Sequence, residues 1–586
     1  MMNQDNDFKI ANQIRIRKIR IENFKSIKKL DLVLANDKQI LIGQNNAGKS
    51  NLLHALDCVF NWAYPISESD IHTNIKDGEF TYIDVMLIPF LDDFSPEWYS
   101  VFDGRFERNE FGERSFSIRC VISKNENTDR YEVERFPFLD WNSKDFKNDR
   151  GYRFTKNFRK CVTSFYITSS RDIISELRFK NSNFSSLLRD SNFVLGESDR
   201  KEIEKELSII NELIVAKMPE ISDIENRLSN ISTTIDGSEK ISILPIPNKL
   251  NDLDKGVEIL IKNKGIELPI NMYGDGTRSW MSILTLNAFV ELRKTQNYQE
   301  GLPFFPIVLI EEPEAHLHSQ AQKKILTQLL GIDCHLMVTT HSSDILSNAS
   351  DLEIIRLFKD EYETSFVKVA ENENHIDKFI FQVKNLIIPY HTELLFSEIT
   401  ILVEGMSDKI FLENYFEYKT NKKVHEMGIS VINVNGAGNL GTFRAFCEAF
   451  RVKNYILADR DKKNEVEQNI IKNNLENTNL YFTNNLELED DMFLENKNVI
   501  ISMFLEETSV NYQHKQALKK SHDLDDKALK YLKENKDKHP YLIKKYYNND
   551  SNKCFQLSIL ETLLRIILNE NRGENNGNNN IATTNS

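Results

Sequence analysis

Apolar and polar positions divide the chain, from residue 13 onward, into short elements with the periods of regular secondary structure. Residues 13–27 (QIRIRKIRIENFKSI) alternate apolar with basic or polar side chains, a pattern typical of a strand with one face in water. Residues 40–56 (ILIGQNNAGKSNLLHAL) predict a strand, a glycine-rich loop and a helix in turn. Residues 80–89 and 115–123 predict two further strands. The chain therefore opens with mixed strands and helices.

The pattern changes twice further along the chain. Residues 175–235 carry apolar positions at helical spacing among charges, which predicts a helical insertion. Strand and helix signals return from 241 to 357, and residues 391–482 repeat them as a smaller unit. The last hundred residues are rich in lysine and predict helices. The fold class predicted is therefore α/β with a helical C-terminal region.

These shifts predict two domains and a tail. The first covers residues 1–390 with the insertion as its dimerisation element, the second covers residues 391–572, and residues 573–586 (GENNGNNNIATTNS) are expected to be disordered. A chain of 586 residues is long enough for two cored domains.

Composition narrows the class of protein. The formal net charge is −14, so the chain has no overall basic field, and DNA contact would need local basic patches or metal ions bridging carboxylates to phosphates. The six cysteines form no CxxC pair, which favours a reducing compartment and disfavours a zinc or disulfide framework. Residues 1–10 are polar and acidic, and no apolar run approaches about 18 residues. We therefore expect a cytoplasmic protein without a membrane segment.

Residues 43–50 match the phosphate-binding pattern GxxxxGK[ST] in full. Glycines permit a tight turn whose N–H groups cradle phosphate at the start of a helix. Lys49 is expected to reach the β- and γ-phosphates of ATP, and Ser50 to coordinate Mg²⁺. The predicted contacts with the nucleotide in this loop are Gly43, Asn46, Gly48, Lys49, Ser50 and Asn51.

Two later segments carry candidate partners for this loop. The apolar run 305–310 (FPIVLI) ends in Glu311 and Glu312; we expect Glu311 to hold Mg²⁺ through water and Glu312 to polarise the attacking water. His341 follows another apolar run; in ABC-type ATPases, which this order of motifs resembles, a histidine at that place senses the γ-phosphate, and the resemblance implies the same role here. The small residues Gly274 and Gly276 precede a helix predicted to begin near Trp280, which suits contact with a phosphate presented by a second subunit.

A second group of acids lies in the smaller unit. Glu404 and Asp408 lie in ITILVEGMSDKIF (399–411), and Asp459 and Asp461 lie in YILADRDKK (455–463). Each segment places acids after a short apolar run that predicts a buried strand. Such acids can meet at the carboxyl edge of a parallel sheet, where open α/β folds build their sites. Crowded carboxylates repel one another unless divalent cations neutralise them, so the pattern favours two-metal phosphodiester chemistry.

The strand–acid pattern of residues 399–463 resembles a Toprim domain, the metal-dependent module of topoisomerases, primases and certain nucleases. The first half, with RIENFKSI near its start and EEPEAHLH at 311–318, resembles the ABC-type heads of the RecF/SMC-like group. It departs from many relatives in having Glu311 where they have Asp. An ABC-type head followed by Toprim resembles the OLD family of ATP-regulated nucleases, over roughly residues 13–545. YITSSRDI (166–173) is also similar to that family.

The resemblance implies cofactors, partners and site residues. ATP and Mg²⁺ or Mn²⁺ would be the cofactors, DNA the substrate, and a homodimer or higher oligomer would form through the ATPase heads. Subfamilies with this plan include the Gabija anti-phage nuclease and some retron effectors; the first would imply a helicase-like partner and the second a reverse transcriptase with its DNA. The implied metal ligands are Glu404, Asp408, Asp459, Asp461, Glu487 and Glu489.

The acids at 487 and 489 permit two interpretations. On an extended segment, alternating carboxylates would face one side together, as a two-metal site needs. The same residues could instead begin an exposed acidic helix. The resemblance also implies a catalytic lysine beyond the acids, with Lys538 the first candidate and Lys544 the second. Residues 511–545 hold ten lysines and five acids, a local charge of +5 that suits phosphate contacts.

The function predicted is ATP-regulated, metal-dependent cleavage of DNA in anti-phage defence. The main alternative is a DNA-repair or structural ABC-type ATPase whose Toprim region only binds DNA. A topoisomerase or primase is a second alternative, but no winged-helix tyrosine platform or zinc module is evident. A third is a signalling scaffold whose partner carries the nuclease activity.

Overall fold

The computed structural model describes residues 13–75, 80–125, 128, 130–143, 152–168, 197–217, 260–263, 266–269, 272, 274–349, 353–360, 363–368, 383–538, 541 and 555–571. The chain divides into two compact units. The first comprises residues 1–345 and 351–366, and the second comprises residues 346–350 and 367–586. The predicted tail and most of the predicted insertion lie outside the described residues, although one helix, α8 (Glu197–Lys217), falls within the insertion.

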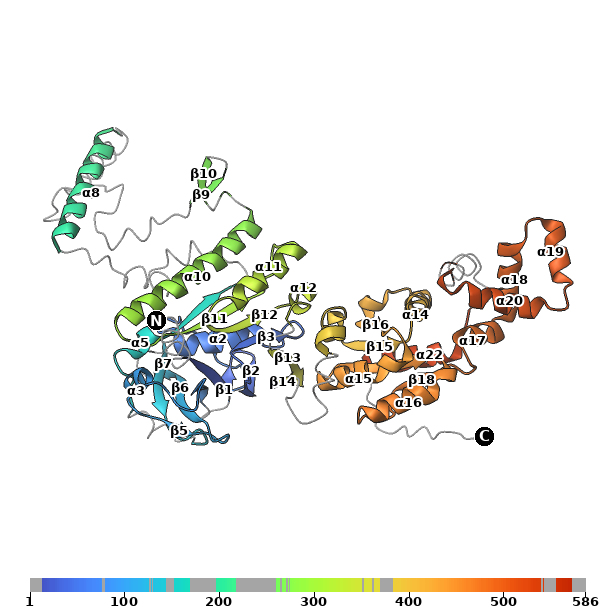
Figure 1. Cartoon of the computed structure of the whole chain (residues 1–586), viewed down its shortest axis with the longest axis horizontal. Coiled ribbons are helices and arrows are strands. Elements are labelled where there is room, and N and C mark those ends of the chain that lie inside the picture. Colours follow the sequence, from blue (N-terminus) through green and yellow to red (C-terminus); the bar gives the residue numbers. More distant parts are fainter. Residues whose placement is uncertain are drawn as a thin grey trace, which may run out of the picture. The chain divides into compact units, whose positions relative to one another are not determined.

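The first unit is built on two six-stranded sheets (Figure 1). One is antiparallel, in the order β2-β1-β4-β6-β5 with β7 also paired to β6. The other runs β14-β13-β3-β12-β11-β8, and its strands from β13 to β8 are parallel. Helix α2 contacts strands of both sheets, so its apolar side chains belong to a core shared by the two.

The elements of the first unit have the following bounds. The antiparallel sheet contains β1 (Ile14–Phe24), β2 (Ile27–Val33), β4 (Thr81–Pro89), β5 (Glu107–Arg108), β6 (Arg114–Asn125) and β7 (Arg130–Phe138). The other contains β3 (Lys38–Ile42), β8 (Val162–Ile167), β11 (Phe305–Glu311), β12 (His335–Thr339), β13 (Glu353–Asp360) and β14 (Glu363–Lys368), and a separate hairpin joins β9 (Leu260–Asn263) to β10 (Ile266–Pro269). The helices are α2 (Lys49–Phe60), α3 (Pro96–Phe102), α5 (Phe158–Cys161), α8, α10 (Asp275–Gln299), α11 (Ser319–Leu330) and α12 (Ser343–Leu346).

The second unit has a four-stranded parallel sheet in the order β16-β15-β17-β18. Its strands are β15 (Ile399–Val403), β16 (Ile429–Asn433), β17 (Lys453–Ala458) and β18 (Leu480–Phe482). Its helices are α14 (Met406–Thr420), α15 (Leu440–Ala449), α16 (Lys463–Lys472), α17 (Leu488–Glu495), α18 (Lys497–Thr508), α19 (Tyr512–Lys519), α20 (Leu524–Glu534) and α22 (Ser558–Asn571). One apolar core joins the sheet to α14, α17, α18, α20 and α22.

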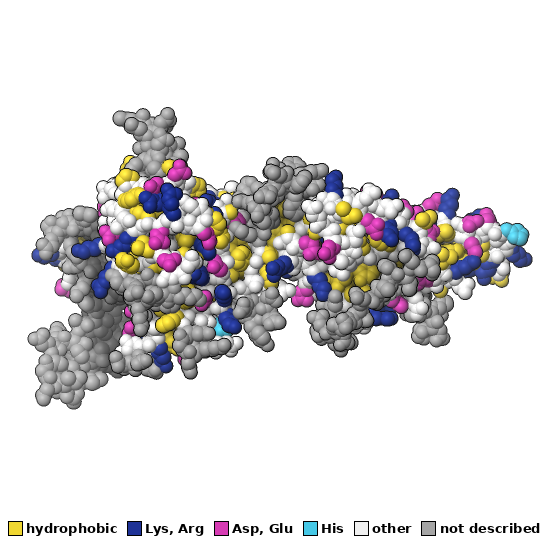
Figure 2. All heavy atoms as spheres, turned by 90° about the horizontal axis from the view of Figure 1, so that it is seen from below, with side chains coloured by type: hydrophobic (Ala, Val, Ile, Leu, Met, Phe, Trp, Pro, Cys, Tyr) yellow, Lys and Arg dark blue, Asp and Glu magenta, His cyan; other side chains and the backbone are white. Residues whose placement is uncertain are grey.

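The predicted α/β fold class with a helical C-terminal region is confirmed. The structure also tests two expectations drawn from composition, on surface charge and on membrane-spanning segments. On the face drawn in Figure 2, Lys and Arg side chains are interspersed with Asp and Glu rather than gathered into one basic field. Within the described residues, no helix combines the length and the apolar character that crossing a bilayer requires.

A buried ion-pair cluster explains why the wet-face prediction for residues 13–27 is wrong at Arg20. Strand β1 lies between β2 and β4, and Arg20 is only 8% exposed. Arg20 and the fully buried Arg119 both pair with the carboxylate of Asp84, which is 0% exposed. Since removing one partner leaves charge buried and unpaired, this cluster is a point of vulnerability.

We predict that Asp84→Asn lowers the free energy of unfolding of the first unit by about 3–5 kcal/mol, because two buried guanidinium groups lose their counter-charge. The shift of its unfolding transition in urea measures this loss. Asp31→Asn is the control, because the Asp31 side chain is 43% exposed and 3.5 Å from Lys18; its effect should stay below about 1 kcal/mol. Equal shifts in the two variants would contradict the prediction.

Candidate functional site

The loop between β3 and α2 has the backbone that its glycines predict. Gly43 adopts φ +146° and Gly48 φ +98°, and a Cβ at Gly43 would collide with the carbonyl oxygen of Leu357. Lys49 folds back over the loop, and its Nζ donates to the carbonyl oxygens of Gly43 (2.8 Å) and Gln44 (2.9 Å). Burial lowers the pKa of Lys49 to about 8, although nearby carboxylates act in the opposite direction.

The remaining residues predicted for this loop have different surroundings. Asn46 has a positive φ of 64°, which asparagine tolerates better than most residues. Ser50 is exposed at the start of α2. The Asn51 amide donates to the Ser26 hydroxyl (2.6 Å), so it ties the helix to the turn after β1.

The two acids after β11 face different neighbours. Glu311 is the last residue of the strand, and its Oε1 is buried without a hydrogen-bond partner among the described residues. Glu312 has φ 43°, and its N–H donates to the carbonyl oxygen of Thr339 (2.9 Å). Its Oε1 lies 4.0 Å from His341 Nε2. The structure therefore brings Glu312 and His341 together, as their positions after neighbouring parallel strands predict.

No role was predicted for Glu314 from the sequence. Its Oε1 accepts from the Thr340 hydroxyl (2.8 Å) and from the backbone N–H of His341 (2.7 Å). Burial raises the pKa of Glu314, and Glu312 adds to the effect. Glu314 thus fixes the backbone that carries His341. In the sequence, the only indication of this role is that Glu314 is the third acid of the run EEPE (311–314).

The glycines near α10 lie against the loop that follows β11. Gly274 is the N-cap residue of α10, which begins at Asp275 rather than near Trp280. A Cβ at Gly276 would lie 2.9 Å from the carbonyl oxygen of His316. Glycine at 276 therefore permits close packing of the helix start on that loop, while the role of both glycines toward a second subunit stays a prediction.

In the second unit, acids gather at the carboxyl ends of two neighbouring strands. Glu404 directly follows β15 and Asp459 directly follows β17, and these strands pair in parallel with Val403 opposite Leu457. Asp408 lies in the first turn of α14, and its Oδ2 accepts from the Gly405 N–H (3.0 Å). Parallel pairing thus brings segments more than fifty residues apart to one edge of the sheet.

Electrostatic coupling shows that these carboxylates share one environment. Burial raises the pKa of Asp459 to about 7, and the charges of Asp408, Glu489 and Glu404 contribute. Burial also raises the pKa of Glu404, with Asp408 and Asp461 adding to it. The pKa of Asp408 rises for the same reason, with Glu489 as its neighbour. Like charges held together out of water favour protonation, or a cation.

The extended-segment interpretation of residues 487 and 489 is wrong. Helix α17 begins at Leu488 with Glu487 as its N-cap residue, and the Glu487 N–H donates to Asp490 Oδ2 (3.1 Å). Asp459 Oδ1 accepts from the Leu488 N–H (2.9 Å), which holds the helix start against β17. Glu489 is nevertheless only 2% exposed, so the helix start brings one acid into the cluster.

Two lysines lie beside these acids. Lys533 Nζ lies 3.5 Å from Glu487 Oε1 and 2.9 Å from Asp490 Oδ1, and Lys536 is the one that reaches the buried Glu489. Lys536 Nζ lies 2.9 Å from Glu489 Oε2 and 3.4 Å from Glu487 Oε2. Burial lowers the pKa of Lys536, but the two carboxylates together raise it by more than burial lowers it. The pKa of Lys536 therefore lies above its ordinary value. Lys538 instead donates to Asn535 Oδ1 (2.8 Å). Lys544 lies outside the described residues.

The acids provide ligands suited to a hard divalent cation, although they do not form a closed cage. Among the described residues, no three His, Cys, Asp or Glu side chains stand close enough to enclose a metal ion. Glu404 Oε1 is buried without a hydrogen-bond partner in that part of the chain. An all-carboxylate donor set suits Mg²⁺ and Mn²⁺. The residues therefore fit a metal site, while Asp461, with a 41% exposed side chain, lies at its rim.

Two segments of the chain match known protein families. Residues 15–346 match the family described as AAA ATPase domain. The chain belongs to this ATPase family. Residues 395–461, which contain the acids after β15 and β17, match the family described as overcoming lysogenization defect protein-like, TOPRIM domain. The predicted combination of ATPase and OLD-type Toprim domains is confirmed.

Individual relatives cover most of the chain. It is 23% identical over 482 residues to the Old nuclease of Escherichia phage P2, covering 76% of this chain and 77% of that protein. It is 23% identical over 533 residues to the endonuclease GajA of Bacillus cereus, covering 77% and 74% respectively. An SMC head bound to a winged-helix domain of ScpA aligns at a TM-score of 0.32 and 18% identity, over 61% of this chain and 98% of that one. A TM-score this low supports no argument.

We predict that, without divalent metal, the stability of the second unit falls as the pH rises through about 7. The folded pKa of Asp459 lies above its ordinary 3.8, so its stabilising contribution is complete below that value and is lost as the folded carboxyl ionises. The free energy of unfolding of Asp459→Asn, relative to that of the unsubstituted protein, should therefore be about 3 kcal/mol more favourable to folding at pH 8 than at pH 5.

Unfolding in urea with a chelator, at both pH values, measures this gain. Asp461→Asn is the matched control, since it makes the same substitution at a neighbouring carboxylate whose side chain is 41% exposed. The same pH dependence in both variants would show that the burial of Asp459 is not the cause.

Proposed function

We propose that the protein is a divalent-metal-dependent DNA endonuclease of the OLD type, regulated by ATP. The observation that carries this proposal is the group of neighbouring acids within and beside the Toprim match, the partly buried Glu404, Asp408 and Asp459 and the buried Glu489. Relatives that match most of the chain are named as nucleases, which supports the same reaction class.

The proposed metal ligands are these four acids, with Asp461 and Glu487 at the rim. Bound Mg²⁺ or Mn²⁺ would lower the pKa of a water and neutralise charge on the scissile phosphate, and we infer that two ions do so. The chain's own contribution is to hold its carboxylates at the ends of β15 and β17 and the start of α17. The hydrogen bonds that Asp408 and Asp459 accept limit their rotation, so the ligands need little reorganisation.

Lys536 is our candidate for stabilising the charge of the transition state. Its ammonium group already lies against Glu489 and Glu487. Once metal occupies those carboxylates, the ammonium group would be released to donate to a phosphate oxygen, where negative charge accumulates. Lys538, the candidate from sequence, contacts only Asn535 among the partners that the structure describes.

We infer that ATP regulates cleavage rather than drives it, because hydrolysis of a phosphodiester is already downhill. Lys49 and Ser50 would contact the phosphates and Mg²⁺, with Glu311 near the metal, Glu312 polarising water and His341 sensing the γ-phosphate. The distance of 4.0 Å between Glu312 and His341, together with the hydrogen bond from the His341 N–H to Glu314, supports this division of roles. Dimerisation or higher assembly through the ATPase parts would complete the site.

The biological role we propose is anti-phage defence, which the GajA relatives suggest. DNA would be the substrate, and a helicase-like protein or a reverse transcriptase with its DNA would be the partner. A platform that only binds DNA is the alternative. The buried Glu404 oxygen without a partner argues for catalysis, because binding alone gives no reason to bury such an acid.

We predict that Glu404→Gln lowers the rate of plasmid cleavage in Mg²⁺ or Mn²⁺ roughly 100-fold or more, because it removes one charge from the proposed metal site. Agarose electrophoresis of supercoiled plasmid measures the rate. Glu467→Gln, a carboxylate on α16 that pairs with Lys463, is the control and should cleave normally. Undiminished cleavage by Glu404→Gln would favour the DNA-binding alternative.

Substitution of two nearby lysines separates the candidates for transition-state stabilisation. Lys536→Met should reduce the cleavage rate roughly 100- to 1,000-fold, as expected when a donor to the transition state is lost. Lys538→Met should remain within about twofold of the unsubstituted protein, as for other exposed substitutions. The reverse order would return the role to Lys538.

The regulatory role of ATP has its own test. Lys49→Ala should abolish ATP hydrolysis and make the rate of plasmid cleavage independent of added ATP, because the γ-phosphate loses its main cationic contact. Nicking assays with Mg²⁺, with and without ATP, measure this dependence. Equal rates with and without ATP in the unsubstituted protein would remove the regulatory claim and leave the nuclease claim intact.

A further inference from the structure

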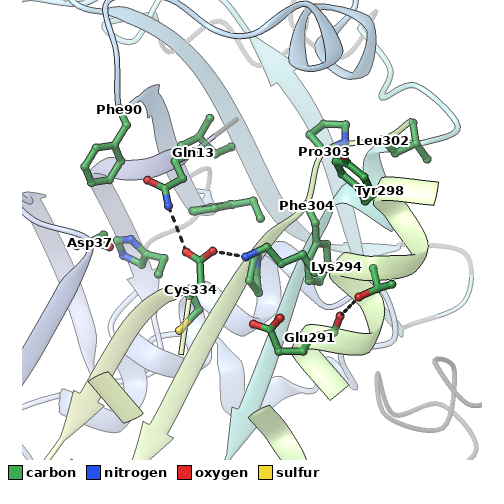
Figure 3. A pocket seen from close by; sticks show the side chains of 16 residues that line it. Gln13, Asp37, Phe90, Glu291, Lys294, Tyr298, Leu302, Pro303, Phe304 and Cys334 are labelled. Atoms are coloured by element: carbon green, nitrogen blue, oxygen red, sulfur yellow. Dashed lines mark hydrogen bonds and ion pairs between the residues drawn. The ribbon is translucent and has the colours of Figure 1, made fainter. Parts of the chain in front are cut away.

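A cavity of about 330 Å³ opens in the first unit, away from the nucleotide loop (Figure 3). Asp37 directly precedes β3, Phe305 is the first residue of β11, and His335 is the first residue of β12; all three line the cavity. The nucleotide loop and the acids after β11 lie at the other ends of these parallel strands. The cavity therefore belongs to the amino-terminal edge of the sheet, and its volume lies in the range of small-molecule sites.

His335 is the reason to treat this cavity as a binding site. The residue is only 1% exposed, and neither Nδ1 nor Nε2 has a hydrogen-bond partner among the described residues. Burial lowers the pKa of His335 to about 3, with Arg15 contributing, so the ring is neutral and offers one N–H donor and one acceptor. Buried polar groups in proteins are rarely left unpaired, so this ring is suited to a partner inside the cavity.

The charged groups of the lining favour a positively charged ligand. Asp333 is already engaged by Lys294 and by the Gln13 amide (3.3 Å), as the dashed lines in Figure 3 show. Asp37 and Glu291 also line the cavity, and because Asp37 is partly exposed and Glu291 exposed, a ligand can reach their carboxylates. With three acids and one lysine in the lining, a phosphate or carboxylate ligand would be repelled.

The apolar part of the lining favours a ligand with a flat body. Phe90 and Tyr298 stand on opposite sides of the cavity in Figure 3, and Pro303 and Phe304 lie beside Tyr298. Aromatic faces attract both rings and cations. A ligand that uses all these groups would combine an ammonium group, an aromatic ring and a polar group able to pair with imidazole.

We propose that this cavity binds a small aromatic amine. Its ammonium group would meet the carboxylates of Asp37 and Glu291, its ring would lie among the aromatic side chains, and a hydroxyl or ring N–H would pair with His335. This site is independent of the proposed nuclease reaction. Because β11 and β12 run from this cavity to Glu311 and toward His341, the ligand would lie on strands that also carry the nucleotide site.

Three ligands that share the same ring but differ in charge test the proposal. Tyramine, its neutral analogue tyrosol and the anion 4-hydroxyphenylacetate are titrated by calorimetry into the full-length protein, with the nucleotide loop saturated by a non-hydrolysable ATP analogue and Mg²⁺. Tyramine should bind at least tenfold more tightly than tyrosol, because a charged hydrogen bond to carboxylate is lost in the latter, and the anion should bind most weakly.

Variants locate the binding to the cavity. Asp37→Asn and Glu291→Gln should each weaken tyramine binding several-fold and the pair roughly tenfold or more, while tyrosol binding stays unchanged. Glu97→Gln, which alters a partly exposed carboxylate on α3 outside the cavity lining, is the control and should have no effect. Thermal unfolding verifies that each variant is folded.

Three results would overturn the proposal. Absence of binding by all three compounds would mean that the cavity takes none of this class. Tyrosol or the anion binding as tightly as tyramine would exclude a cation site. Unchanged tyramine binding in the folded double variant would place any binding elsewhere.

Discussion

Repulsion between carboxylates held at the end of a parallel sheet is the constraint on which the second unit depends. Parallel pairing of β15 with β17 requires the residues that follow them to lie at one edge, and those residues are Glu404 and Asp459. Burial there raises the pKa of both acids. The fold thus maintains an arrangement of charge that is unfavourable until a cation enters, which is the physical basis for a metal site.

The first unit applies the same geometry to another chemistry. Glu311 ends β11, and Glu312 follows it beside His341. There a side chain of the protein, Lys49, supplies the positive charge: it interacts electrostatically with Glu312 and Glu314 and donates to a carbonyl oxygen of the loop. In the second unit Lys536 serves the same purpose for Glu489. The acids of each unit are therefore accompanied by lysines from other segments of the chain, which are Lys49 in the first unit and Lys533 and Lys536 in the second.

The two edges of the largely parallel sheet in the first unit carry different polar groups. The carboxyl edge carries the nucleotide loop, whose glycines allow the backbone to approach a phosphate. The amino edge carries the cavity with the neutral His335 and an excess of acids, which suits an amine instead. One sheet can thus present two ligand sites of opposite charge preference because its strands are parallel and all their starts lie at one end.

The sequence by itself determined the nucleotide loop, the strand that ends at Glu311 and the acids after β15 and β17, because each of these signals is local: an apolar run followed at once by a glycine turn or an acid. Only the tertiary structure decided the rest. Glu489 joins the acids because Asp459 holds the start of α17 against β17, Lys536 rather than Lys538 meets the acids because α20 packs beside α17, and Arg20 is buried because β4 supplies Asp84. These are contacts between distant segments, and the pattern of one segment carries no information about which other segment will cover it.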